Sequence, residues 1–244
     1  MACVLAGGMA HADASEPIHL PGIKGHDDRE LVRTTNYPWS AIGRVNKRIG
    51  GFCTGTVIGP RTVLTAAHCL WNTRTQNWLP PDSLHFVTGY QKGEYLAASA
   101  VTSFKVDDGF KFVKNSKLSN LVTDWAVLDL KEEIGVLSGT IPLSPTSLSL
   151  AEGSGYTLIQ AGYSQDKAHI LTTHDDCRLI RKELGGRIFL HTCDAVKGDS
   201  GSPIMVKGAG SSFYQLVGIH VATRVVKAGK NQGIAISVVD LSLF

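Results

Sequence analysis

Three short segments of the chain carry a histidine, an aspartate and a serine in settings suited to nucleophilic catalysis. They are Thr65-Ala-Ala-His68-Cys69, Thr123-Asp124-Trp125-Ala126 and Gly198-Asp199-Ser200-Gly201-Ser202-Pro203. A serine hydroxyl is a weak nucleophile at neutral pH, so it needs an adjacent base, and that base needs a third group that fixes its tautomer. Acyl transfer can therefore use Ser200 as the nucleophile, His68 as the general base and Asp124 as the carboxylate that orients the base.

The order of these residues along the chain, His then Asp then Ser, resembles that of the chymotrypsin-like serine proteases, whereas subtilisin-like and α/β-hydrolase enzymes use other orders. Gly25–Arg29, Tyr37–Gly43 and Phe52–Pro60 are similar to the bacterial glutamyl endopeptidases of that family. The resemblance implies an all-β fold with two six-stranded antiparallel β-barrels and an active site in the cleft between them. It also implies a serine endopeptidase that acts on protein or peptide substrates and is secreted or periplasmic.

The resemblance assigns further residues around the nucleophile and the base. The backbone N–H groups of Gly198 and Ser200 are expected to form the oxyanion hole, since flanking glycines let the backbone turn sharply. Cys53 and Cys69 occupy the family's positions for a disulfide that braces the histidine loop. Cys177 and Cys193 are left over and can pair across a hairpin. No Cys/His spacing resembles a metal site, and no cofactor is expected.

The residues expected around the specificity pocket give two conflicting indications of the preferred substrate. Asp194, six residues before Ser200, takes the position that in trypsin-like enzymes attracts Lys or Arg, and we expect this preference. The alternative is cleavage after Glu, because Gly218-Ile219-His220 matches the histidine segment of glutamyl endopeptidases. Those enzymes also carry Ser or Thr where this chain has Ala195. A buried Asp194 would repel a substrate carboxylate unless His220 were protonated and close to it.

Bulk composition excludes several classes of protein. The charged fraction of 18% and the apolar fraction of 43% indicate a globular chain. A net charge of +3, scattered along the sequence, does not suggest binding to nucleic acid or a membrane surface. No apolar run approaches the length of a transmembrane span. A monomer is expected.

The sequence also suggests how the chain is divided. Residues 1–14 resemble the end of a secretory signal with an Ala12-Asp13-Ala14 cleavage site, although a basic start is missing. Residues 15–22 are a possible pro-segment, 23–135 the N-terminal barrel with its arm, and 136–244 the C-terminal barrel. Asp199 matches the aspartate that in trypsin-like zymogens pairs with a new N-terminus, which implies activation by cleavage near Ile23.

Short β-rich runs separated by turn signals support a barrel or a sandwich. The expected strands are Ala41–Val45, Phe52–Ile58, Thr62–Ala66, Leu84–Thr88, Leu96–Phe104, Trp125–Leu130, Tyr156–Ala161, Cys177–Ile180, Ile188–His191, Pro203–Val206, Phe213–His220 and Gly233–Val238. Long helices are not evident, and one helical turn is expected after the histidine, within residues 66–71.

Two other functional classes compete with the protease hypothesis. A catalytically inactive binding module could reuse the fold, but the intact His68, Asp124, Ser200 and Gly198 argue against it. An esterase or lipase would need a Gly-x-Ser-x-Gly elbow and the order Ser, Asp, His, which are missing.

Overall fold

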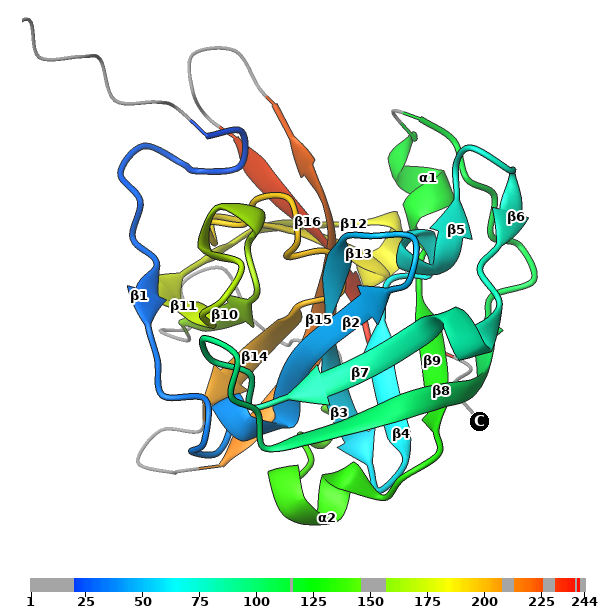
Figure 1. The fold of residues 1–244 in the computed structure, drawn as a ribbon. Coiled ribbons are helices and arrows are strands. Elements are labelled where there is room, and N and C mark those ends of the chain that lie inside the picture. The colour runs from blue at the N-terminus through cyan, green and yellow to red at the C-terminus, as the bar shows by residue number, and fades with distance from the viewer. Residues whose placement is uncertain are drawn as a thin grey trace, which may run out of the picture.

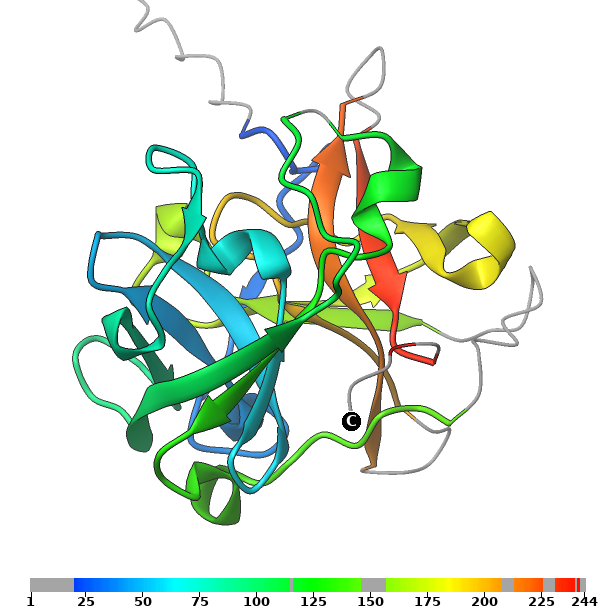
Figure 2. The same ribbon diagram turned by 90° about the vertical axis from the view of Figure 1, so that its right-hand side faces the viewer.

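The structure is a computed structural model that describes residues 20–114, 116–145, 157–207, 213–225, 231–239 and 241. These residues form two β-units that lie side by side (Figures 1 and 2). The predicted signal at residues 1–14, and residues 15–19 of the predicted pro-segment, lie outside the described residues. No helix among the described residues is long and apolar enough to cross a membrane.

The first unit is a closed barrel of six antiparallel strands in the order β2-β3-β4-β9-β8-β7. Its strands are β2 (Ile42–Lys47), β3 (Phe52–Gly59), β4 (Thr62–Thr65), β7 (Leu84–Thr88), β8 (Ala97–Val106) and β9 (Ala126–Leu130). In β9 the only exposed residue is Asp129, which lies between the buried Leu128 and Leu130 and points to the opposite face of the strand. Fully buried Leu64 and Phe86 are part of the barrel core.

The second unit is a curled sheet of eight antiparallel strands in the order β1-β11-β10-β14-β15-β16-β13-β12. Its strands are β1 (Glu30–Leu31), β10 (Leu158–Gly162), β11 (Thr172–Cys177), β12 (Leu179–Glu183), β13 (Ile188–His191), β14 (Pro203–Lys207), β15 (Tyr214–Arg224) and β16 (Gln232–Ser237). The predicted all-β, chymotrypsin-like fold class is confirmed. This unit has eight strands where six were expected, since β1 and β12 extend its two edges.

The remaining elements are short. They are the hairpin strands β5 (Trp71–Asn72) and β6 (Asn77–Trp78), the helices α1 (Leu118–Leu121) and α2 (Ile134–Ser138), and the 3₁₀ turns η1 (Trp39–Ala41), η2 (Ala67–Leu70), η3 (Pro81–Ser83), η4 (Gln165–Lys167) and η5 (Leu184–Gly186). The turn η2 confirms the helical turn predicted after the histidine. The boundary predicted between residues 135 and 136 falls inside α2 and stays a prediction.

One expected strand is wrong in its bounds. The predicted strand Cys177–Ile180 spans the junction between β11 and β12. Most of β11 went unrecognised because exposed Asp175 and Asp176, residues with low strand propensity, interrupt its alternation.

An N-terminal arm, residues 20–41, links the two units. It follows the outside of the second sheet, where Glu30 in β1 lies opposite Thr173 in β11, and then enters the first barrel at β2. In Figure 1 the arm is the blue segment that passes β11 and β10. Its path brings residues 22–29 against the loop that precedes Ser200, so the arm becomes part of the candidate site.

Candidate active site

The pairing of β4 with β9 brings His68 and Asp124 together. Thr65 lies opposite Ala126 in this pairing, and the two functional residues follow and precede that pair by three and two positions. Asp124 Oδ1 accepts the backbone N–H of His68 at 2.8 Å, and Oδ2 lies 2.7 Å from His68 Nδ1. Because Asp124 is buried and acceptor-only when ionised, this contact places a proton on Nδ1 and leaves Nε2 free to act as a base.

The loop that carries Ser200 is held by β3 and β15. Thr54 of β3 donates its backbone N–H to Ser200 O at 2.9 Å and its Oγ1–H to Gly198 O at 3.0 Å. Gly201 donates its N–H to His220 O of β15 at 2.7 Å. A Cβ at Gly201, which has a φ of +81°, would lie 2.2 Å from Thr65 Oγ1, so only glycine fits there.

A disulfide lies between the base and the nucleophile loop. The structure contains the bonds Cys53–Cys69 and Cys177–Cys193. Cys69 Sγ is 3.9 Å from His68 Nε2 and 3.8 Å from Ser200 O, so the bridge lies close to both functional residues. No hydrogen bond joins Ser200 Oγ to His68 within the described chain. Such contacts are often long before substrate binds.

We expect both disulfides to form in solution. Alkylation without prior reduction should leave these four cysteines unlabelled, and proteolytic mapping should recover peptides linked Cys53–Cys69 and Cys177–Cys193. Cys53→Ser should lower the free energy of unfolding by about 3 kcal/mol, because the unfolded chain regains a loop of 16 residues. Alkylation of any of the four in the unreduced protein would contradict the pairing.

The disulfide also removes a possible metal site. The tightest cluster of metal-ligating residue types in the described chain is Cys53, His68 and Cys69. Both sulfurs of this cluster are bonded to each other, and metal sites need thiolates. This cluster therefore cannot bind a metal while the disulfide is intact.

Two backbone N–H groups face no acceptor next to the nucleophile. Gly198 has a φ of +104°, and a Cβ there would lie 2.5 Å from Tyr163 O. Among the described residues, no hydrogen bond is donated by the N–H of Gly198 or of Ser200. Unpaired donors at this position can stabilise the oxyanion of a tetrahedral intermediate.

Asp199 stabilises the loop that carries Ser200 through buried hydrogen bonds. Its Oδ2 accepts Ser164 Oγ–H at 2.7 Å and the Val196 N–H at 2.8 Å, whereas Oδ1 is buried without a partner in the described chain. Burial raises the pKa of Asp199 to about 6. Activation by cleavage near Ile23 stays a prediction. In the intact chain Ile23 is buried and its carbonyl accepts Asn231 Nδ2–H at 3.2 Å.

The contacts of Asp194 belong to the N-terminal arm. Its Oδ1 accepts the Lys24 backbone N–H at 2.7 Å and its Oδ2 the Asp28 backbone N–H at 3.0 Å, and His174 Nδ1 lies 3.5 Å from Oδ2. Burial alone would raise the pKa of this carboxyl, but the nearby His174 side chain and the hydrogen bonds from the two backbone N–H groups lower it. Asp194 is thus an ionised anchor for the arm. The sequence left open whether Asp194 would lie close to His220, and in the structure Asp194 contacts His174.

Lys24 adds a buried cation beside this anchor. Its Nζ donates to Gly22 O at 3.0 Å and to Cys193 O, and it forms no ion pair among the described residues. Burial lowers the pKa of Lys24 to about 8, although Asp194 and Asp199 raise it. The ammonium therefore remains mostly protonated at pH 7.

Two buried histidines, His191 and His220, are hydrogen-bonded to each other. The Cys193 N–H donates to His191 Nδ1 at 3.2 Å, and His191 Nε2 lies 3.1 Å from His220 Nδ1. With Nδ1 of His191 accepting, its Nε2 carries the proton and donates to His220, which leaves the His220 proton on Nε2. Burial, with the charges of Lys24 and His68, lowers the pKa of His220 to about 3. His220 is therefore a neutral donor rather than the imidazolium considered above.

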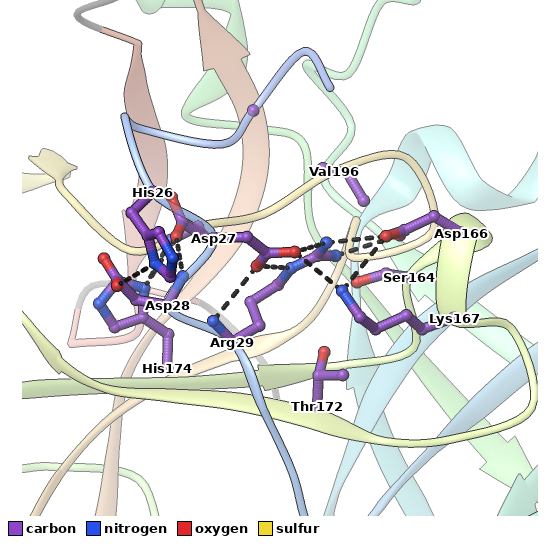
Figure 3. A network of polar contacts seen from close by, with 12 residues as sticks. His26, Asp27, Asp28, Arg29, Ser164, Asp166, Lys167, Thr172, His174 and Val196 are labelled. Atoms are coloured by element: carbon purple, nitrogen blue, oxygen red, sulfur yellow. Dashed lines mark hydrogen bonds and ion pairs between the residues drawn. The ribbon is translucent and has the colours of Figure 1, made fainter. Parts of the chain in front are cut away.

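An ion-pair cluster ties the arm to the loop behind Asp199 (Figure 3). The fully buried Arg29 guanidinium binds Asp27 through Nε at 2.8 Å and Asp166 through an Nη at 2.7 Å. Lys167 Nζ lies 2.8 Å from Asp27 Oδ2. Asp166 of the η4 segment therefore forms an ion pair with Arg29, and Ser164, just before this segment, donates a hydrogen bond to Asp199. Sequence reasoning named the motif around Arg29 but did not foresee this contact.

The comparisons with known proteins agree with this geometry. The family model described as Trypsin matches residues 28–243. A glutamyl endopeptidase of Bacillus licheniformis is 30% identical over 196 residues, which cover 78% of this chain and 57% of that protein. Coagulation factor IX of Oryctolagus cuniculus is 24% identical over 214 residues, 75% of this chain and 70% of that protein. A solved structure of a Glu endopeptidase in complex with MPD superposes with a TM-score of 0.71 at 23% identity, covering 88% of this chain and 93% of that chain.

Proposed function

Since the chain belongs to the trypsin family of serine proteases, we propose that it is a serine endopeptidase that cleaves after glutamate through Ser200, His68 and Asp124. The observation that carries the catalytic assignment is the pair of contacts between buried Asp124 and His68, at 2.8 and 2.7 Å. An inactive binding module would not need a histidine held in one tautomer. Nor would it need a serine next to two unpaired backbone N–H groups, those of Gly198 and Ser200.

The proposed reaction follows from these positions. Ser200 Oγ attacks the scissile carbonyl while His68 Nε2 takes its proton, and the N–H groups of Gly198 and Ser200 stabilise the oxyanion. His68 then gives the proton to the leaving amine as the C–N bond breaks, which leaves an acyl ester on Ser200. Water repeats the sequence with His68 as base and releases the acid. Asp124 keeps the imidazole oriented and stabilises the imidazolium.

An exposed strand edge can hold the substrate backbone. β14 pairs with β15 only as far as Ile219, while β16 covers the other edge of β15 up to Arg224. Residues 221–224 thus offer unpaired backbone groups next to the cleft. A substrate can add here as an extended antiparallel strand, as peptides do at other sheet edges. In that orientation the scissile bond lies near Ser200, and the preceding residues extend toward Arg224.

The contacts around the specificity pocket favour glutamate over Lys or Arg. The sequence position of Asp194 predicts a basic preference, but both of its carboxylate oxygens already accept hydrogen bonds from the arm. His220 carries its proton on Nε2, and the Lys24 ammonium is buried nearby without a carboxylate partner among the described residues. A substrate carboxylate would accept the His220 Nε2–H, and the positive charge of Lys24, which acts on His220, would also favour it. The relative from Bacillus licheniformis is named a glutamyl endopeptidase. Ala195 has no side-chain donor, and its backbone N–H already donates to Gly22 O at 3.3 Å.

We expect a peptide library to be cut mainly after Glu. Replacing His220 by valine should lower kcat/KM for Glu substrates about 10- to 100-fold, because a hydrogen bond to a charged group is lost. Cleavage after an uncharged residue should change little. The ratio of kcat/KM for Glu and Gln substrates should stay constant from about pH 5.5 to about pH 7, since the lowered pKa keeps His220 neutral there and Lys24, with a pKa of about 8, stays mostly protonated.

The alternative predicts a different set of results. Cleavage mainly after Lys or Arg, abolished by Asp194→Ser, would show that Asp194 reads the substrate in spite of its contacts with the arm. A Glu/Gln ratio that falls as pH rises from about 5.5 to about 7 would show that a protonated histidine binds the carboxylate. Either result would overturn the pocket assignment and leave the catalytic assignment intact.

The cellular setting is part of the same proposal. We place the protein outside the cytoplasm, secreted or periplasmic, because two disulfides persist in oxidising compartments. Protein or peptide chains are its substrates, and it acts as a monomer without a cofactor. The chain spans 57% of the length of the curated glutamyl endopeptidase, so these features are proposed rather than transferred from it.

A further inference from the structure

A cleft of about 700 Å³ leads away from His68 between the two units. One wall is formed by lining residues from 110–114 and 116–121 of the first unit, and the other is the end of β15 with residues 221–225. His68 and Asp124 lie at its inner end. The cleft therefore begins at the proposed catalytic base and follows the strand edge proposed to bind the substrate backbone.

The charges that line this cleft are almost all positive. The exposed charged side chains among its described lining residues are Lys111, Lys114, Lys117 and Arg224. The carboxylate in the lining is Asp124, which is buried and bonded to His68. Four cations therefore surround this cleft in a chain whose total net charge is only +3.

Aromatic packing fixes the wall that carries the lysines. Phe110 packs on Trp78, with ring centroids 5.2 Å apart, and Phe112 stacks on Trp71 at 6.5 Å with an interplanar angle of 13°. Lys111 lies between the two anchored rings, and Lys114 follows closely. Cations attached to an anchored segment lose less conformational freedom when they bind a partner.

We propose that this cationic cleft selects substrates with acidic side chains at the second to fourth residues before the scissile bond. The inference rests on the proposed endopeptidase function and on the antiparallel strand at residues 221–224. Along such a strand, successive side chains point to opposite sides, so acidic groups meet Arg224 on one wall and the three lysines on the other. Positive potential in a cleft also speeds the encounter with an acidic chain.

The test uses internally quenched peptides that share one residue before the scissile bond and one leaving segment. The shared residue is the one that the peptide library shows to be preferred before the scissile bond. The test therefore works whether the enzyme prefers Glu or a basic residue there. The second to fourth residues before the bond are Asp or Glu in one series, the isosteric Asn or Gln in another, and Lys in a third. We expect kcat/KM about three- to tenfold higher for the acidic series than for the amide series, and lowest for the lysine series.

Two further measurements assign the effect to the cleft. Raising the salt concentration from about 20 mM to about 500 mM should remove most of the preference, because the pairs are exposed and screened. The variant K111Q/K114Q/K117Q should lose most of the preference while keeping kcat/KM for the amide series within about twofold. The matched control K105Q/K131Q, exposed lysines outside the cleft, should keep it.

Equal rates for the acidic and amide series at low salt would overturn the proposal. So would a preference that survives undiminished in the triple lysine variant, or one that the control variant removes equally. A failed proposed function has a different signature, because no peptide of any series would then be cut. A cleft that served another polyanion would leave the peptide series equal and so would also overturn the substrate assignment.

Discussion

Ser200→Ala and His68→Ala should each lower kcat by about five to six orders of magnitude. The serine cannot attack without a base, and the base has nothing to activate without the serine, so the two residues act as a unit. The double variant S200A/H68A should therefore be little slower than either single variant. Residual turnover would come from substrate binding and the unpaired donors of Gly198 and Ser200.

Steady-state kinetics on one peptide substrate, with the concentration of folded protein verified by circular dichroism, would measure these losses. His85→Ala is a suitable control, because His85 is exposed on β7 and contacts neither residue. Its rate should match the wild type. Turnover within tenfold of wild type in purified Ser200→Ala protein would refute the proposed nucleophile.

Asp124→Asn should lower kcat about 10⁴-fold and leave the fold intact. The amide oxygen can still accept the His68 backbone N–H that Oδ1 binds now. The amide nitrogen, however, would donate to Nδ1 and move the ring proton to Nε2, where the proton of Ser200 has to be received. The base would be held in place in the wrong tautomer.

The matched control for this substitution is Asp129→Asn. Asp129 lies in β9, five residues further along, is exposed, and accepts the Ser103 Oγ–H at 2.6 Å. Sequence analysis does not include it in the site, and its replacement should change kcat less than twofold. Equal losses in the two variants would show that the effect comes from disturbance of β9 rather than from the tautomer of His68.

The fold class and the three catalytic candidates were predictable because the information is local. A histidine after a strand, an aspartate before one, and a serine between glycines each carry their setting in a few neighbouring residues. The order of the three then selects one fold family. Both cysteine pairs were also accessible, one from the family positions and one by elimination.

The pocket was less predictable because its chemistry depends on distant contacts. Asp194 is separated from Lys24 by 170 positions in the chain, and no local pattern announces that a backbone N–H of the arm will bind its carboxylate. His191 and Lys24 were missed for the same reason. A buried histidine in a β-strand and a lysine near a terminus are ordinary residues until the fold brings them beside His220.

Secondary-structure errors have a similar origin. β11 carries two exposed aspartates, and β1, β5 and β6 each have only two residues. These strands are held by tertiary pairing, such as Glu30 opposite Thr173, rather than by propensity. Such elements leave little signal in a sequence.

The most direct test of the account is covalent labelling with a fluorophosphonate probe, followed by mass spectrometry of the digested protein. The probe reacts with a serine only when a neighbouring base activates its hydroxyl. We expect one adduct, on Ser200, and its loss in His68→Ala protein that retains the wild-type circular dichroism spectrum. An unlabelled wild-type protein, or equal labelling with and without His68, would contradict the claim that this chain is a serine endopeptidase acting through Ser200.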